Sequence, residues 1–91
     1  MTLQDTLVAL EHHHVTQIRC RTARGSTVAI TLELTPCGAE FYRLEDGAGV
    51  VSYHTDETTL WNDLLWRHQV NADDVDYTLR PVAKVLDSGP I

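Results

Sequence analysis

Apolar and polar residues alternate most regularly between residues 16 and 34. Ile18 and Cys20 alternate with arginines, and a second alternating stretch covers residues 28–34. Residues 24–26, which read Arg-Gly-Ser, separate the two stretches. A period of two is typical of a strand that buries one face. The pattern therefore predicts a β-hairpin, with strands from Thr16 to Thr22 and from Val28 to Leu34.

A second hairpin is predicted directly after the first. Residues 40–44 and 50–54 resemble strands, and residues 45–49 between them contain two glycines, which permit a tight reversal. Residues 36–38, which read Pro-Cys-Gly, break the strand before them. Connections this short cannot form parallel crossovers, so we expect all four strands to run antiparallel.

Two segments have helical spacing instead. Over residues 3–13 apolar residues recur every three or four positions, and Thr2 with Asp5 resembles a capping box. A second helix is expected from about Glu57 to Gln69, capped by Thr55 or Asp56. Its predicted apolar face consists of Leu60, Trp61, Leu64, Leu65 and His68.

The remaining chain is predicted to form one more strand. Asn71 is expected to end the helix in left-handed geometry, and Asp73 with Asp74 is expected to form an exposed turn. A short strand then follows from Val75, and Pro81 would confine it to an edge of the sheet. Residues 87–91 are expected to fray.

These elements follow each other in the order α-β-β-β-β-α-β. The expected fold class is α+β, an antiparallel sheet of four to five strands with both helices packed on one face. A length of 91 residues suits one compact domain, residues 1–91. Apolar residues make up 43% and charged residues 22%, which is typical of a globular chain and argues against disorder as the main state.

Charge is distributed unevenly along the chain. The net charge is −6, with 13 acidic and 7 basic residues. Residues 1–44 hold four of each kind, whereas residues 45–91 hold nine acidic and three basic residues, so the whole excess lies in the second half. Nucleic-acid binding needs a positive surface, so this balance disfavours it. A protein partner with a basic surface is expected instead.

Trp66 is the residue that most clearly departs from the pattern. On the predicted helix it points about 170° away from the apolar face, among polar residues. An outward tryptophan is typical of an anchor for a partner. The expected partner-binding residues are Trp66 and the surrounding acids Asp56, Glu57, Asp63, Asp73, Asp74 and Asp76. Two alternatives remain open at this point: residues 80–86 cover Trp66, or the acids form an ordinary solvated face.

Other residues give weak chemical signals. His12, His13 and His14 are consecutive, and successive helical side chains diverge by about 100°, so they cannot all face one metal from a regular helix. Cys20 is expected to be buried, whereas Cys37 is expected in a reachable loop, where only tertiary contact could bring His54 to it. No catalytic or cofactor motif is present, so we expect a protein that is not an enzyme, with neither metal nor cofactor.

The expected function is that of a small acidic protein-binding module. It would act as an inhibitor or adaptor, of the kind that phages and mobile elements encode, by occupying a surface on a larger macromolecule. One alternative is a small-ligand or metal-binding protein that uses histidines and Cys37. Another is a self-assembling subunit that forms a homodimer. Two cysteines, no signal peptide and no membrane span lead us to expect a cytoplasmic protein with reduced thiols.

Overall fold

The computed structural model describes residues 2–80, apart from the side chain of Asp74. The elements are α1 (Leu3–Glu11), β1 (Val15–Thr22), β2 (Thr27–Leu34), β3 (Glu40–Glu45), β4 (Val51–His54), α2 (Glu57–Asn62), the π-helix η1 (Asp63–Arg67) and β5 (Val70–Leu79). The α+β class and the order of the elements are as predicted. The predicted edge position of Pro81 and the predicted fraying of residues 87–91 lie outside the described residues. So does the alternative that residues 80–86 cover Trp66, except for Arg80.

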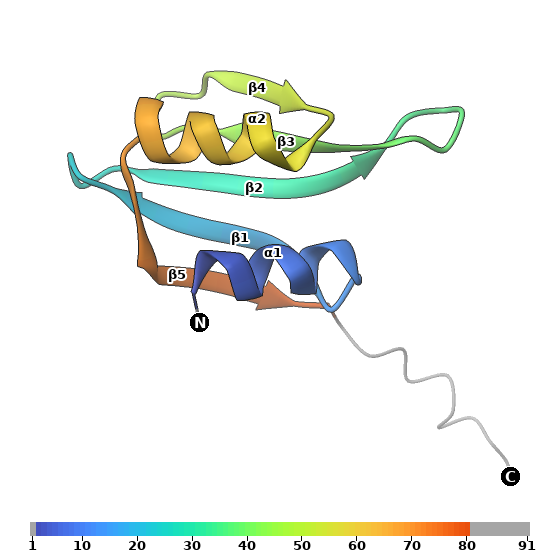
Figure 1. Cartoon of the computed structure of the whole chain (residues 1–91), viewed down its shortest axis with the longest axis horizontal. Coiled ribbons are helices and arrows are strands. Elements are labelled where there is room, and N and C mark those ends of the chain that lie inside the picture. The colour runs from blue at the N-terminus through green and yellow to red at the C-terminus, as the bar shows by residue number, and fades with distance from the viewer. Residues whose placement is uncertain (1, 81–91) are drawn as a thin grey trace, which may run out of the picture.

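The five strands form one antiparallel sheet in the order β4-β3-β2-β1-β5. Short turns join the first four strands into a meander. The chain then leaves the β4 edge, passes along α2 and η1, and returns as β5 at the opposite edge, beside β1 (Figure 1). This return places the end of η1 near the turns between β1 and β2 and between β3 and β4.

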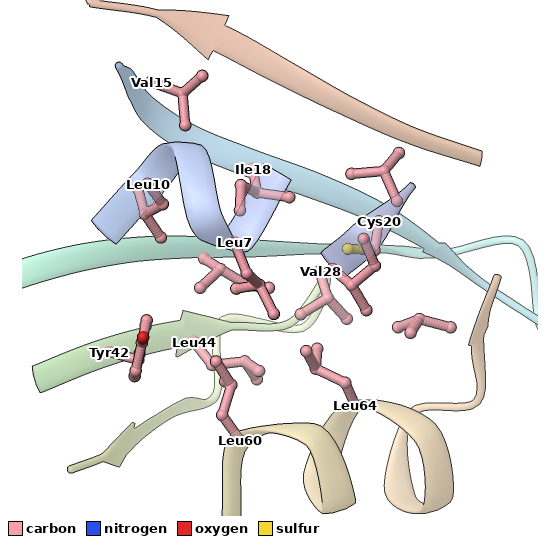
Figure 2. Close-up of a cluster of buried hydrophobic side chains, with 14 residues drawn as sticks. Leu7, Leu10, Val15, Ile18, Cys20, Val28, Tyr42, Leu44, Leu60 and Leu64 are labelled. Carbon is pink, nitrogen blue, oxygen red and sulfur yellow. The ribbon is translucent and has the colours of Figure 1, made fainter. Parts of the chain in front are cut away.

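Both helices pack on the same face of the sheet, as predicted (Figure 1). Ile18, Ile30 and Leu44 lie opposite one another across three neighbouring strands and are completely or almost completely buried. Leu7 of α1 and Leu60 of α2 reach this row from the two helices (Figure 2). Burial of each leucine side chain stabilises the fold by about 1.5–3 kcal/mol, so these contacts hold both helices on the sheet.

The first helix begins as predicted and ends earlier. The Thr2 hydroxyl accepts a hydrogen bond from the backbone N–H of Asp5 at 3.2 Å, which caps the N-terminus of α1. The helix ends at Glu11, two residues before the predicted end. His12, His13 and His14 form the turn into β1, and His13 has a left-handed φ of 61°.

The second helix is correctly located but irregular. The Asp56 carboxylate caps α2 by accepting from the backbone N–H of Thr59 at 2.9 Å. After Asn62 the coil widens into the π-helix η1, which the predicted regular helix over residues 57–69 did not include. Gln69, with φ of 51°, takes the left-handed position that the sequence assigned to Asn71.

The prediction for β5 was wrong at its start. Asp73 and Asp74 lie inside the strand, which begins at Val70, and they do not form a turn before it. Cys20 pairs with Val75, and Thr22 pairs with Val70. Between these pairs β1 advances by two residues and β5 by five, so β5 bulges. The Asn71 side chain accepts from the backbone N–H of Asp73 at 3.0 Å and supports the bulge locally. Because the residues of this bulge do not alternate between apolar and polar, the sequence pattern did not indicate a strand here.

No helix of the described residues covers the other face of the sheet. Arg19 on this face lies between Asp76 of β5 and Ala29 of β2. The rings of Phe41 and Tyr53 meet edge to face, with centroids 5.5 Å apart. This open face therefore mixes charged, aromatic and small side chains.

Candidate functional site

The densest group of polar side chains lies where η1 packs over β4. Its centre is Asp63, whose side chain is only 8% exposed. The Oδ2 atom of Asp63 lies 2.8 Å from His54 Nε2 and accepts from the Ser52 hydroxyl at 3.3 Å. A buried carboxylate needs such partners, because an unpaired charge in the interior is strongly destabilising. Asp63 thus joins η1 to the edge strand.

The second carboxylate oxygen of Asp63 faces two more basic side chains. Its Oδ1 atom lies 3.6 Å from a terminal nitrogen of Arg67 and 3.9 Å from His68 Nε2. His68 Nε2 is buried and has no hydrogen-bond partner. The wide π-helical turn brings the backbone N–H of His68 to the Asp63 carbonyl at 3.0 Å. The irregular coil therefore gathers Asp63, Arg67 and His68 at one place.

The contacts of His54 define what this group can do chemically. His54 Nδ1 lies 3.3 Å from the Thr59 hydroxyl, and that hydroxyl donates to the backbone carbonyl of Asp56 at 3.2 Å. The two ring nitrogens of His54 thus contact Thr59 of α2 and Asp63 of η1. These side-chain contacts fasten β4 to α2 and η1.

Trp66 lies on the outer side of the same π-helical turn. Its side chain is 79% exposed, and the neighbouring Leu65 is 41% exposed. Leu64, on the opposite side of the turn, is completely buried in the core. A rigidly anchored turn therefore presents a large apolar ring to the solvent.

The acidic residues predicted to surround Trp66 do not share one surface. Asp63 turns inward, and Asp56 is occupied as the cap of α2. Glu57 is exposed and accepts from the Trp61 indole N–H at 3.4 Å.

The other acids of the set lie on β5. Asp73 is exposed in its bulge, and Asp76 lies on the open face of the sheet, opposite Arg19. The side chain of Asp74 lies outside the described residues. The predicted ring is thus divided between the two faces of the molecule.

The two cysteines have contrasting surroundings. Cys20 is completely buried, and this burial raises the pKa of its thiol to about 12. Cys37 is exposed, and a hydrogen bond with the Thr35 hydroxyl is the main cause that lowers the pKa of its thiol. The hydrogen bonds of residues 2–80 include none between Cys37 and His54. Over the same residues, no three His, Cys, Asp or Glu side chains come together as a metal site.

Sequence reasoning missed Ser52, His54 and His68 as partners of Asp63. Ser52 and His54 occupy alternate positions of β4, opposite Leu44 and Tyr42, so they share the helix-covered face. A polar pair at inward strand positions is the signal that could have indicated a buried charged partner on the helix above.

None of the described helices is both long enough and apolar enough to cross a membrane. Comparison of the chain with protein-family models, with curated proteins and with solved structures yields no match.

Proposed function

We propose that this chain is a protein-binding module that inserts the side chain of Trp66 into an apolar pocket on a partner with a basic surface. The observation that carries the proposal is the 79% exposure of this indole on a helix whose other side is fixed in the core. The module would act as an inhibitor or adaptor. The two free thiols, Cys20 and Cys37, fit a reducing compartment, and we propose the cytoplasm.

An exposed tryptophan supports binding for two physical reasons. Its large ring gains free energy when it leaves water, and tryptophan is among the residues most enriched at the energetic centre of interfaces. Its position on a packed helical turn also means that little backbone order must be gained on binding. Leu65 adjoins Trp66 and extends the apolar contact.

The net charge of −6 supports a basic partner. Asp56 and Glu57 are exposed at the start of α2, the helical segment that continues into Trp66. Charges at the rim of an interface mainly speed association and exclude wrong partners, whereas the buried anchor determines the lifetime of the complex. We therefore assign the affinity of the complex to Trp66 and its association rate to Asp56 and Glu57.

The test begins with a photoreactive benzoylphenylalanine in place of Trp66, used in host cells to cross-link the partner in its native setting. The same residue in place of Tyr53 is the control, because Tyr53 is also an exposed aromatic but lies on the open face of the sheet. A protein cross-linked from position 66 and not from position 53 is then purified. Its affinity is measured for the original chain and for the Trp66→Ala and Tyr53→Ala variants.

We expect Trp66→Ala to weaken binding by about 30-fold or more and Tyr53→Ala to have a small effect. Thermal unfolding of both variants checks that the fold is retained. Equal effects of the two substitutions would reject Trp66 as the anchor. Cross-linking of the chain to a second copy of itself would replace this proposal with self-association.

A further inference from the structure

A hollow of about 440 Å³ opens at the end of the sheet where three segments meet: the β1–β2 turn, the β3–β4 turn and the end of η1. In Figure 1 this is the end at which β5 begins. The two turns are closely packed, since a Cβ added at Gly47 would lie 3.5 Å from the Cβ of Ser26 and 3.6 Å from the backbone oxygen of Thr27. The β1–β2 and β3–β4 turns therefore lie side by side at this end of the sheet.

Basic side chains from two of these segments line the hollow. Arg24 comes from the β1–β2 turn, and Arg67 and His68 come from the end of η1. The hydrogen bonds and ion pairs of the described chain include none made by Arg24. Arg67 is 60% exposed and approaches Asp63 through one terminal nitrogen, so its other donors remain available. Two arginines from different segments thus line one hollow in a chain whose net charge is −6.

The buried carboxylate of Asp63 lies behind this wall. It faces both Arg67 and His68, at 3.6 Å and 3.9 Å, and so holds two basic side chains that line the hollow. The π-helical turn that produces this arrangement is a rare element that is frequent at functional sites. His68 Nε2 is buried without a hydrogen bond, which is a cost that a purely structural histidine would avoid.

One acidic residue, Asp46, also lines the hollow. Its Oδ1 atom accepts from the backbone N–H groups of Val50 and Ala48, each at 2.9 Å. These bonds, with smaller contributions from the charges of His68 and Arg67, lower the pKa of the carboxyl group. The charge of Asp46 is thus stabilised by its own turn and by the basic residues. Among the charged side chains that line the hollow are two guanidinium groups and this one carboxylate.

We propose that this hollow binds a small oxyanion of the phosphate class, held by Arg24 and Arg67 with His68 at its side. The planar donor fork of a guanidinium matches the oxygen geometry of a phosphate group, and two such forks from different segments close around one anion. Asp63 is a positioning residue, since it orients Arg67 and His68 from behind. This site does not include Trp66 and does not depend on the proposed protein partner.

The test is a titration of the isotope-labelled chain with inorganic phosphate, followed by NMR, with sodium chloride keeping the ionic strength constant. We expect saturable shifts at the amide of Gly47, at the amide of Arg67 and at the His68 ring. The substitutions Arg24→Ala and Arg67→Ala should each weaken binding by about tenfold or more. Arg43→Ala, on the open face of the sheet, is the matched control and should leave the affinity unchanged.

Absence of saturation up to about 50 mM phosphate would overturn the proposal, since even weak specific sites lie in the millimolar range. The same holds if chloride alone reproduces the shifts, or if Arg43→Ala weakens binding as much as Arg67→Ala. Asp63→Asn should reduce phosphate affinity and broaden the His68 signals while the chain still unfolds cooperatively. Trp66→Ala should bind phosphate normally, so this site and the protein-binding surface can fail separately.

Discussion

The two cysteines differ in their exposure to solvent, and this difference determines their chemistry. Cys20 is completely enclosed on the core side of β1, and removal from water disfavours its thiolate, which raises the thiol pKa to about 12. Cys37 is exposed, and its pKa is lowered mainly by the hydrogen bond with Thr35. Cys37 is therefore the accessible thiol of the two and the one with the lower pKa, while Cys20 packs as a small apolar residue.

Stability should depend on pH through Cys20. The folded-state pKa is raised from 9.0 to about 12, so the stabilisation is complete below pH 9 and is lost as the pH rises toward 12, because only the unfolded chain ionises readily. We expect the free energy of unfolding to fall by about 1 kcal/mol more between pH 9 and pH 10 in the original chain than in Cys20→Ala. Urea unfolding at both pH values measures this difference. Equal slopes for the two chains would contradict the assignment.

Helical-wheel reasoning could place Trp66 but not Asp63. Trp66 lies opposite Leu64 within a single element, so its outward direction follows from local spacing, and the side chain is exposed. The same wheel put Asp63 on the polar side, yet its carboxylate turns toward Ser52 and His54. These partners belong to β4, and a pattern within one element contains no information about a neighbour brought in by the fold.

The backbone is strained at the junction between two elements, η1 and β5. Gln69 has a φ of 51°, a left-handed conformation that L-residues other than glycine adopt at a cost of about 1–2 kcal/mol. The backbone carbonyl of Gln69 accepts from the N–H of Ala23 at 3.0 Å, which fixes this conformation against the β1–β2 turn. The strain is thus maintained by contact with the sheet.

Gln69→Gly should stabilise the protein by about 0.5–1 kcal/mol. Glycine adopts this φ without strain, and its greater freedom in the unfolded chain removes part of the gain. Chemical denaturation measures the change. The control is Gln17→Gly in the interior of β1, where an extended strand gains nothing from glycine and stability should fall. A loss of stability in Gln69→Gly would show that the side chain, and not the backbone, determines this turn.

Alternation predicted the elements that bury one face regularly. Ile18 and Cys20 of β1 and Val28 and Ile30 of β2 alternate into the core, so both strands and their turn followed from the sequence. The start of β5 could not be predicted from the sequence pattern. Asn71 and Asp73 lie in a bulge, where apolar and polar residues do not alternate. The π-helix was also missed, because its apolar spacing over one turn cannot be distinguished from that of an α-helix.

At the scale of the whole molecule, the sheet separates the acidic residues into two groups. Glu57 is exposed on α2, on the side of the sheet that also carries Trp66. Asp76 lies across the sheet, where it faces Arg19 and is partly balanced by it. The electrostatic interaction of a partner docked over Trp66 would therefore be stronger with Glu57 than with Asp76. The reason is that exposed charges are screened over about 8 Å at physiological salt.

Charge reversal on the two faces tests this geometry. With the partner captured through position 66, Glu57→Lys should slow association several-fold at low salt, because it converts attraction into repulsion near the docking surface. Asp76→Lys, a reversal of the same size, should have a smaller effect. The two rates should converge at high salt, and the dissociation rates should change little. Stopped-flow association at two ionic strengths provides the measurement. A larger effect from Asp76→Lys would move the docking surface to the open face of the sheet, where the exposed Tyr53 packs edge to face against Phe41.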